Sequence, residues 1–245
     1  MYRVGIDLGG TNIVSGVVDE NYKIIATGKL KTNVPRPAEE IADDMAKTVY
    51  EAVENAGLTM DDIEFIGIGS PGAIDPIKGV VTYANNLYFE NVHMCELMKA
   101  RVPKDCYIEN DANAAAYGEY IAGAGRGTKN FVAITLGTGV GGGIIIDGKI
   151  YSGSNYAGGE LGHTVINMNG EACTCGRHGC WEAYASATAL INQTKQAMHR
   201  YPDSLMWKLC DGDINNVSGI TAFNAMRNND PIGKMVVDRY CEYVA

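Results

Sequence analysis

The sequence predicts an α/β protein made of two related domains, because one strand pattern occurs twice along the chain. In each copy, an apolar run ends at a glycine-rich turn and the chain returns as a second apolar run. The expected strands cover residues 3–7, 13–19 and 24–31 in the first copy, and residues 131–136, 143–146 and 149–152 in the second. Such a repeat indicates two similar domains that face one another across a cleft. We place the boundary near residue 112, which gives domains of residues 1–112 and 113–245.

Helical periodicity appears in two other parts of the chain. Apolar residues recur every four positions within residues 38–56, as an amphipathic helix requires, and Gly57 follows as a stop signal. Residues 63–69 are apolar without a helical period and predict a buried strand. Beyond residue 182 the spacing is helical again, including residues 222–244.

The composition excludes several classes of protein. Of 245 residues, 46% are hydrophobic and 20% are charged, which is enough to bury a substantial core. The net charge of -9 repels nucleic-acid phosphates, so we expect no nucleic-acid partner. The N-terminus does not resemble a secretory leader, and the uncharged stretch at residues 130–146 is interrupted by glycines. We therefore expect a cytoplasmic protein without a membrane segment.

Two glycine-rich turns are candidate phosphate-binding loops. Bare backbone amides at such turns can donate hydrogen bonds to phosphate oxygens, although ordinary tight hairpins also need glycine. The candidate residues are Gly9, Gly10, Thr11 and Asn12 in the first loop and Gly137, Thr138 and Gly139 in the second. The second loop matches a dinucleotide-binding pattern formally, but that pattern must open a helix and here a strand follows.

Two carboxylates occupy positions that suit phosphoryl transfer. Asp7 ends the first strand just before a glycine loop, where it could hold a magnesium ion through water or act as a local turn cap. Asp111 lies between a short strand at residues 105–108 and an alanine-rich helical stretch. At that junction Asp111 could act as a general base, or Asn110 or Asp111 could simply cap the helix.

Three of the seven cysteines lie within eight residues, which indicates a metal site rather than disulfides. Cys173, Cys175 and Cys180 supply three thiolates, and tetrahedral zinc needs a fourth ligand. We choose His163 ahead of His178 for that position. A closed Cys3His site is structural, and it would fix the loop that carries Glu160. The alternative is three unligated cysteines.

The ordered set of motifs resembles the ROK family of sugar kinases and repressors. The motifs are Asp7-Leu-Gly-Gly-Thr-Asn12, Glu109-Asn-Asp-Ala-Asn113, Leu136-Gly-Thr-Gly-Val-Gly141, Gly159-Glu-Leu-Gly-His163 and Cys173-x-Cys-Gly-x-x-Gly-Cys180. The resemblance implies the actin-like (ribonuclease H-like) two-domain sugar kinase fold, in agreement with the repeated strand pattern. Family members usually continue for several dozen residues beyond a helix like residues 231–245, so the C-terminal part of the second domain is expected to be missing.

The resemblance also implies roles for individual residues. Asp111 is the catalytic base, and the glycine loops hold the phosphates of ATP with magnesium. The implied sugar ligands are Gly72, Asn86, Asn110, Glu160, His163 and Glu182. His163 would then serve both zinc and the sugar, one through each ring nitrogen.

The implied reaction is ATP-dependent phosphorylation of a hexose at its primary hydroxyl. Residues 182–188 are most similar to ROK glucokinases of Gram-positive bacteria, which favours conversion of glucose to glucose 6-phosphate. Kinases for fructose, mannose, allose or N-acetylmannosamine share the same motifs, and a non-catalytic sugar-binding protein is a further alternative. The family's repressors carry a helix-turn-helix ahead of the first glycine loop, for which this sequence has no room. The resemblance leaves a homodimer open.

Overall fold

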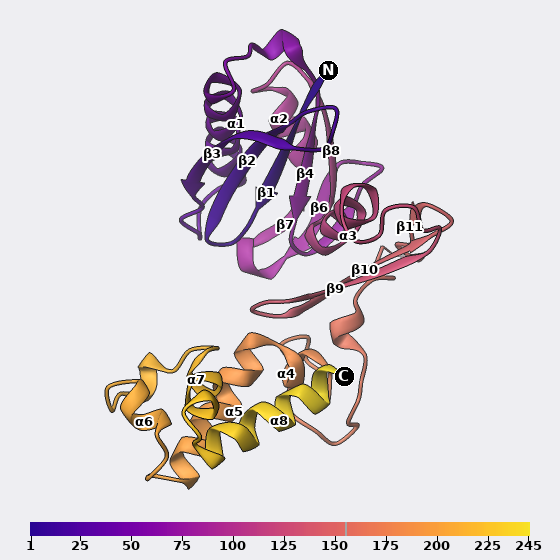
Figure 1. The fold of residues 1–245 in the computed structure, drawn as a ribbon. Coiled ribbons are helices and arrows are strands. Elements are labelled where there is room, and N and C mark those ends of the chain that lie inside the picture. Colours follow the sequence, from indigo (N-terminus) through magenta and orange to yellow (C-terminus); the bar gives the residue numbers. More distant parts are fainter. Residues whose placement is uncertain (155) are drawn as a thin grey trace. The chain divides into compact units, whose positions relative to one another are not determined.

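The computed structural model describes residues 1–154 and 156–245 and divides into two compact units (Figure 1). Unit 1 comprises Met1–Ala133 and Gly143–Gly159. Unit 2 comprises Ile134–Gly142 and Glu160–Ala245. The predicted division at residue 112 stays a prediction.

A five-stranded sheet in the order β3-β2-β1-β4-β8 forms the centre of unit 1. Its strands are β1 (Tyr2–Leu8), β2 (Asn12–Val18), β3 (Ile24–Lys31), β4 (Ile63–Ser70) and β8 (Asp105–Asn110). The first three strands are antiparallel, as the sequence predicts, whereas β1, β4 and β8 run parallel. The carboxyl ends of β1, β4 and β8 therefore meet at one edge of the sheet, where Asp7 lies beside Gly69 and Ser70 beside Asn110.

Helix α1 (Ala38–Asn55) covers one face of this sheet and confirms the predicted amphipathic helix. Its apolar stripe, which includes Ile41, Met45 and Val49, is buried in the core of unit 1. The helix approaches β3 so closely that a Cβ atom on Gly28 would lie 2.3 Å from the carbonyl oxygen of Thr48. Gly57 follows the helix with φ +68°, a conformation that glycine adopts without strain.

The remainder of unit 1 includes elements that the sequence analysis did not predict. A second, three-stranded antiparallel sheet contains β5 (Ala73–Asp75), β6 (Val80–Ala84) and β7 (Phe89–Val92). Helix α2 (Met94–Lys99) follows it, and helix α3 (Asp111–Ala122) begins directly after β8. Because β8 continues to Asn110 rather than ending at residue 108, the strand leads into α3 without a loop.

The second glycine-rich hairpin repeats the antiparallel part of the first sheet. Its strands are β9 (Phe131–Leu136), β10 (Val140–Ile146) and β11 (Lys149–Ile150), in the order β11-β10-β9. Strand β10 begins three residues earlier than predicted, and β11 ends two residues earlier. Val132, Ile134 and Leu136 alternate along β9 and are all exposed, so one apolar row of this strand is uncovered.

Helices dominate the rest of unit 2. They are α4 (Glu182–Ala185), α5 (Ala187–Arg200), α6 (Met206–Leu209), α7 (Thr221–Arg227) and α8 (Pro231–Val244). The helical spacing predicted across residues 222–244 contains a break, because Asp230 caps α8 through the amides of Ile232 and Gly233 and Pro231 occupies the first turn. Within the described residues, no helix has both the length and the apolar character needed to cross a membrane.

Candidate functional site

The candidate catalytic group, Asp111, is the first residue of helix α3. Asn110 caps this helix, because its Oδ1 accepts hydrogen bonds from the amides of Ala112 and Asn113 at 3.0 and 3.2 Å. The capping role that the sequence analysis left open therefore falls to Asn110. Asp111 is exposed and its carboxylate bonds only locally, to the amide of Ala112 at 2.8 Å. The side chain is thus available to a substrate hydroxyl.

Asp111 packs against the end of the sheet, next to Gly69 and Asn110. The position of a Cβ atom on Gly69 in β4 would be 3.7 Å from the Cα atom of Asp111. Gly72 has φ +96°, and a Cβ atom there would lie 2.2 Å from the carbonyl oxygen of Tyr83. Its own carbonyl oxygen accepts a hydrogen bond from Nδ2 of Asn110 at 3.1 Å. Gly72, Asn110 and Asp111 therefore form one corner of unit 1.

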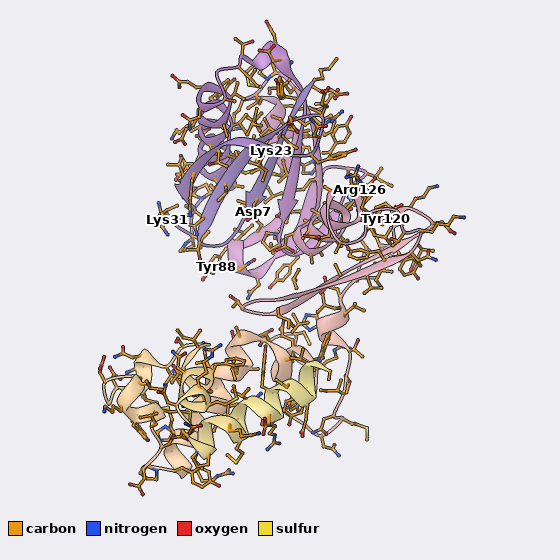
Figure 2. All side chains as sticks on the ribbon, in the orientation of Figure 1. Asp7, Lys23, Lys31, Tyr88, Tyr120 and Arg126 are labelled. Carbon is orange, nitrogen blue, oxygen red and sulfur yellow. The ribbon has the colours of Figure 1, made fainter. Side chains whose placement is uncertain are left out.

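Asp7 belongs to the same corner, at the end of β1 (Figure 2). Partial desolvation and the nearby charge of Asp111 raise the pKa of the Asp7 carboxyl above its ordinary value. Two neighbouring carboxylates that repel one another are stabilised by a cation. The arrangement fits the predicted role of Asp7 toward magnesium.

The first glycine loop follows Asp7 and lies against Asn86, a residue that the sequence analysis names as a sugar ligand. The amide of Gly9 donates to the carbonyl oxygen of Asn12 at 2.9 Å, which closes the turn. A Cβ atom on Gly10 would lie 3.2 Å from the carbonyl oxygen of Asn86, so Asn86 sits directly against this loop. Among the described residues, no acceptor receives the amides of Gly10 and Thr11. Those two donors are available to an anion.

The second glycine loop is held by the segment that follows the cysteines. Oε2 of Glu182 accepts a hydrogen bond from the amide of Val140 at 2.9 Å. A Cβ atom on Gly139 would lie 2.3 Å from the same oxygen, so a larger residue there would displace the Glu182 carboxylate. Glu182, predicted as a sugar ligand, therefore also contacts the candidate phosphate loop within unit 2.

A compact cluster contains the four predicted zinc ligands. One ligand atom from each of His163, Cys173, Cys175 and Cys180 lies within 4.8 Å of every other. The sulfurs of Cys175 and Cys180 are 3.7 Å apart, close to the ~3.8 Å separation of two thiolates on a tetrahedral zinc ion with Zn–S bonds of ~2.3 Å. His178 is exposed and outside this cluster. The residues fit a closed metal site.

The environment of the cluster favours ionisation of one thiol. Hydrogen bonding from the backbone and side chain of Arg177 lowers the pKa of Cys175 to about 6. Burial and the neighbouring thiols raise the pKa of Cys180 in the absence of a metal. A divalent metal would remove the protons that these crowded thiols otherwise retain.

His163 lies between the cysteine cluster and Glu160. Its Nδ1 is 3.6 Å from the sulfur of Cys173, and its Nε2 is 3.9 Å from Oε2 of Glu160. The two ring nitrogens therefore face different groups, as the dual role of His163 requires.

Sequence reasoning missed the contact that braces the junction between β8 and α3. Oε1 of Glu109 accepts hydrogen bonds from the amide of Asn110 at 2.8 Å and from Nδ2 of Asn113 at 3.1 Å. Both residues belong to the quoted motif, but their mutual contact depends on the helix starting at Asp111. Oδ1 of Asn113 is buried without a partner in the described residues.

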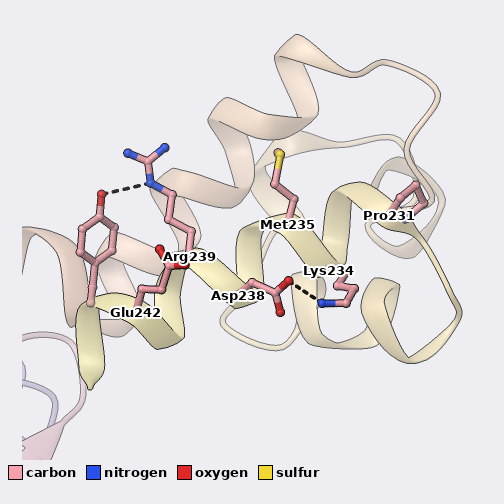
Figure 3. A pocket seen from close by; sticks show the side chains of 7 residues that line it. Pro231, Lys234, Met235, Asp238, Arg239 and Glu242 are labelled. Carbon is pink, nitrogen blue, oxygen red and sulfur yellow. Dashed lines mark hydrogen bonds and ion pairs between the residues drawn. The ribbon is translucent and has the colours of Figure 1, made fainter.

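A shallow groove on helix α8 has none of the predicted site residues in its walls (Figure 3). It is lined by Pro231, Lys234, Met235, Asp238, Arg239, Glu242 and Tyr243. Lys234 pairs with Asp238, and Nε of Arg239 donates to the hydroxyl of Tyr243. Three of the charged side chains in this groove, Lys234, Asp238 and Arg239, thus already have partners within the same helix.

The five-stranded sheet and its repeated hairpin, with a glycine loop in each, define an actin-like fold of the kind found in sugar kinases. The ROK family profile matches residues 3–245, and the chain belongs to that family. It is 37% identical to a glucokinase of Thermotoga maritima over 99% of this chain and 75% of that protein. It is 39% identical to a glucokinase of Streptomyces coelicolor over 98% of this chain and 73% of that protein.

A solved structure of a glucokinase is also similar to this chain. A ROK family glucokinase from Streptomyces griseus, in complex with glucose and AMPPNP, superimposes with a TM-score of 0.83 at 38% identity. The match covers 99% of this chain and 76% of the other. The chain therefore spans about three quarters of the length of these relatives.

Proposed function

We propose that this chain is a glucokinase that transfers the γ-phosphoryl group of ATP to the primary hydroxyl of glucose. The observation that carries the proposal is the position of Asp111, which is exposed as the first residue of α3, directly after the N-cap residue Asn110. Identities of 37–39% with glucokinases over nearly the whole chain support glucose as the sugar.

Asp111 is the general base of this reaction. A carboxylate within about 3 Å of the primary hydroxyl accepts its proton as the hydroxyl oxygen bonds to the γ-phosphorus and the bond to the β-phosphate oxygen breaks. The products are glucose 6-phosphate and ADP. A protein that only binds sugar has no need of a base at this position.

The sugar is held by directed hydrogen bonds from Gly72, Asn86, Asn110, Glu160, His163 and Glu182. Amides and carboxylates can each accept or donate several such bonds to hydroxyl groups. Support comes from the contacts of Asn110 with Gly72 and of His163 with Glu160.

The phosphates are bound by the two glycine loops, residues 9–12 and 137–139, through those backbone amides that have no acceptor in the described residues, namely those of Gly10, Thr11, Thr138 and Gly139. Asp7 holds magnesium through water, and the ion offsets the charge of the phosphates. The raised pKa of Asp7 beside Asp111 supports a cation at that position.

Zinc is structural, held by His163, Cys173, Cys175 and Cys180. It fixes the loop of Glu160 and the segment that begins at Glu182. All seven cysteines lie in the described residues and none of them forms a disulfide, which supports a cytoplasmic location. The net charge of -9 supports the absence of a nucleic-acid partner, and a homodimer is testable by light scattering.

The test is a coupled ADP-release assay with glucose, fructose, mannose, allose and N-acetylmannosamine as acceptors. We expect the highest kcat/KM with glucose. A higher value with another hexose would reassign the substrate within the same reaction. No turnover with any of them, by a chain that is folded and loaded with metal, would contradict the kinase assignment.

A further inference from the structure

The two glycine loops, residues 9–12 and 137–139, each accept a hydrogen bond of the same kind. The function proposed above gives these two hydrogen bonds no role. In each loop, a threonine hydroxyl from a different element donates to a loop carbonyl oxygen. In unit 1, Oγ1 of Thr32 donates to the carbonyl oxygen of Gly9 at 2.6 Å. In unit 2, Oγ1 of Thr188 donates to the carbonyl oxygen of Thr138 at 2.7 Å.

In each unit, a backbone amide at or next to the threonine donates a hydrogen bond to a second carbonyl oxygen of the same loop. The amide of Thr32 donates to the carbonyl oxygen of Thr11 at 3.1 Å. The amide of Ala187, the residue before Thr188, donates to the carbonyl oxygen of Gly137 at 2.9 Å. Two carbonyl groups of each loop are therefore tied to the body of their own unit.

Tied carbonyl groups determine where the loop amides point. In a planar trans peptide, the carbonyl and the next residue's N–H point in opposite directions. The carbonyl groups of Gly9, Gly137 and Thr138 accept hydrogen bonds from the threonine segments. The N–H group of the residue after each of them therefore points away from the threonine. These amides belong to Gly10, Thr138 and Gly139, and none of them donates to another group in the described part of the chain. Unpaired amides aimed outward are what an anion-binding loop needs.

The elements that carry the threonines are themselves fixed. Thr32 is fully buried, and its carbonyl oxygen accepts a hydrogen bond from Nε of Arg36 at 2.7 Å. Arg36 in turn pairs with Asp44 of helix α1 at 2.5 Å. Thr188 lies in the first turn of α5, whose N-cap Ser186 accepts from the amide of Ala189. Thr32 directly follows β3 and Thr188 lies within α5, so each hydroxyl is placed by a regular element.

We propose that Thr32 and Thr188 are positioning residues for nucleotide binding, which hold the amides of both glycine loops in the orientation that receives the ATP phosphates. The inference rests on the proposed function for the identity of the anion. It assigns no contact with the sugar to either residue. Loss of either hydroxyl therefore weakens the binding of ATP and leaves that of glucose unchanged.

The principal test replaces Thr188 with valine, which preserves shape and removes the hydroxyl. We expect Thr188→Val to raise the KM for ATP and the Kd for AMPPNP, measured by calorimetry, about fivefold, as loss of one ordinary hydrogen bond implies. The KM for glucose is expected to stay within about twofold of wild type. Thr188→Ser keeps the hydroxyl and is expected to restore tight nucleotide binding.

Thr128→Val is the matched control. Thr128 is also exposed, and its Oγ1 donates to the carbonyl oxygen of Gly125 at 2.7 Å, outside both loops. Its replacement is expected to leave both KM values unchanged. For the buried Thr32, serine and valine variants with matching melting temperatures give the same comparison, with weaker AMPPNP binding expected only for valine.

The outcomes separate this inference from the proposed function. The positioning role is wrong if Thr188→Val binds AMPPNP as tightly as wild type and Thr128→Val do. It is also wrong if the substitution weakens the binding of glucose and of ATP equally. Either result can be obtained even though the enzyme is a glucokinase. If wild type phosphorylates no hexose yet Thr188→Val alone weakens AMPPNP binding, the positioning role stands and the kinase proposal fails. Absence of AMPPNP binding by wild type contradicts the positioning role as well.

Discussion

The carboxylate of Glu182 accepts a hydrogen bond from the amide of Val140 at 2.9 Å, which connects the segment after the cysteine cluster to the second glycine loop. Glu182 is also a proposed sugar ligand, so this one side chain would contribute to both of the proposed substrate sites. Only Trp181 separates Cys180, a member of the metal cluster, from Glu182, the first residue of α4.

Substitution of Glu182 should separate its two contributions. Glu182→Ala removes the carboxylate and is expected to raise the KM for glucose and for ATP, each by about tenfold or more, since hydrogen bonds to charged groups contribute more than neutral ones. Glu182→Gln keeps an oxygen that can accept from Val140, so it should raise chiefly the KM for glucose. Steady-state kinetics with each substrate varied in turn would show this, and equal effects of both substitutions on ATP would argue against the role in the loop.

Asp7 is expected to lower the stability of the protein at neutral pH. Its folded-state pKa is raised, so the folded protein binds that proton more tightly than the unfolded chain does. The corresponding stability is present at low pH and is lost as the pH rises through the folded pKa. Asp7→Asn should therefore melt at a higher temperature than wild type at pH 7, with the difference shrinking below pH ~4. The variant should also require more magnesium for turnover. A lower melting temperature at pH 7 would contradict repulsion between Asp7 and Asp111.

Asp230 should be one of the most important polar residues for the stability of unit 2. It is buried, caps α8, and also accepts hydrogen bonds from the hydroxyl of Ser204 and the amide of Leu205. Burial opposes its ionisation, but these hydrogen bonds outweigh that effect and lower its pKa. Its contribution is therefore present above the unfolded pKa and is lost as the pH falls through the folded one.

We expect Asp230→Ala to lower the free energy of unfolding by about 2–4 kcal/mol, since a cap and several buried donors lose their acceptor. Urea denaturation followed by circular dichroism would measure it. Asp238→Ala is the control, because Asp238 is half-exposed and its pair with Lys234 is worth less than ~0.5 kcal/mol. Equal losses for the two variants would contradict the assigned role of Asp230.

The cluster of His163 and three cysteines leads us to predict how many zinc ions each chain binds. The purified chain is expected to contain one zinc ion, and His163→Ala and Cys175→Ser should both lose it. His178→Ala should retain it, because His178 is exposed and outside the cluster. Chelation should lower the melting temperature of wild type, since a metal that binds only the folded state stabilises it. Loss of zinc from His178→Ala but not from His163→Ala would reverse the assignment.

The sequence predicted the antiparallel strands, helix α1 and the motif clusters because each depends on local periodicity or spacing. The sheet of β5 to β7 was missed, since its strands are three to five residues long and are separated by turns that give no clear alternation. The break at Asp230 was missed although Asn228-Asn-Asp-Pro231 interrupts the apolar spacing with an N-cap and turn signal. Within the site, the sequence left open whether Asp111 is a general base or whether Asn110 or Asp111 simply caps the helix, and only the start of α3 assigns the cap to Asn110.

The threonine contacts could not be predicted from the sequence. Thr32 follows a strand and Thr188 lies in the first turn of a helix, and neither position has a pattern that points to a loop many residues away. Each contact exists because tertiary packing brings a hydroxyl to a particular carbonyl group. The partners of polar side chains are therefore the part of the site that most requires a structure.

The central claim is that Asp111 accepts the proton from the sugar hydroxyl that becomes phosphorylated. The most direct measurement is phosphorus NMR of glucose and ATP incubated with wild type and with Asp111→Asn, at matched folding and zinc content. Wild type should form glucose 6-phosphate, and Asp111→Asn should form it at least ~100-fold more slowly while still binding glucose. Formation of glucose 6-phosphate by Asp111→Asn at the wild-type rate would contradict the account.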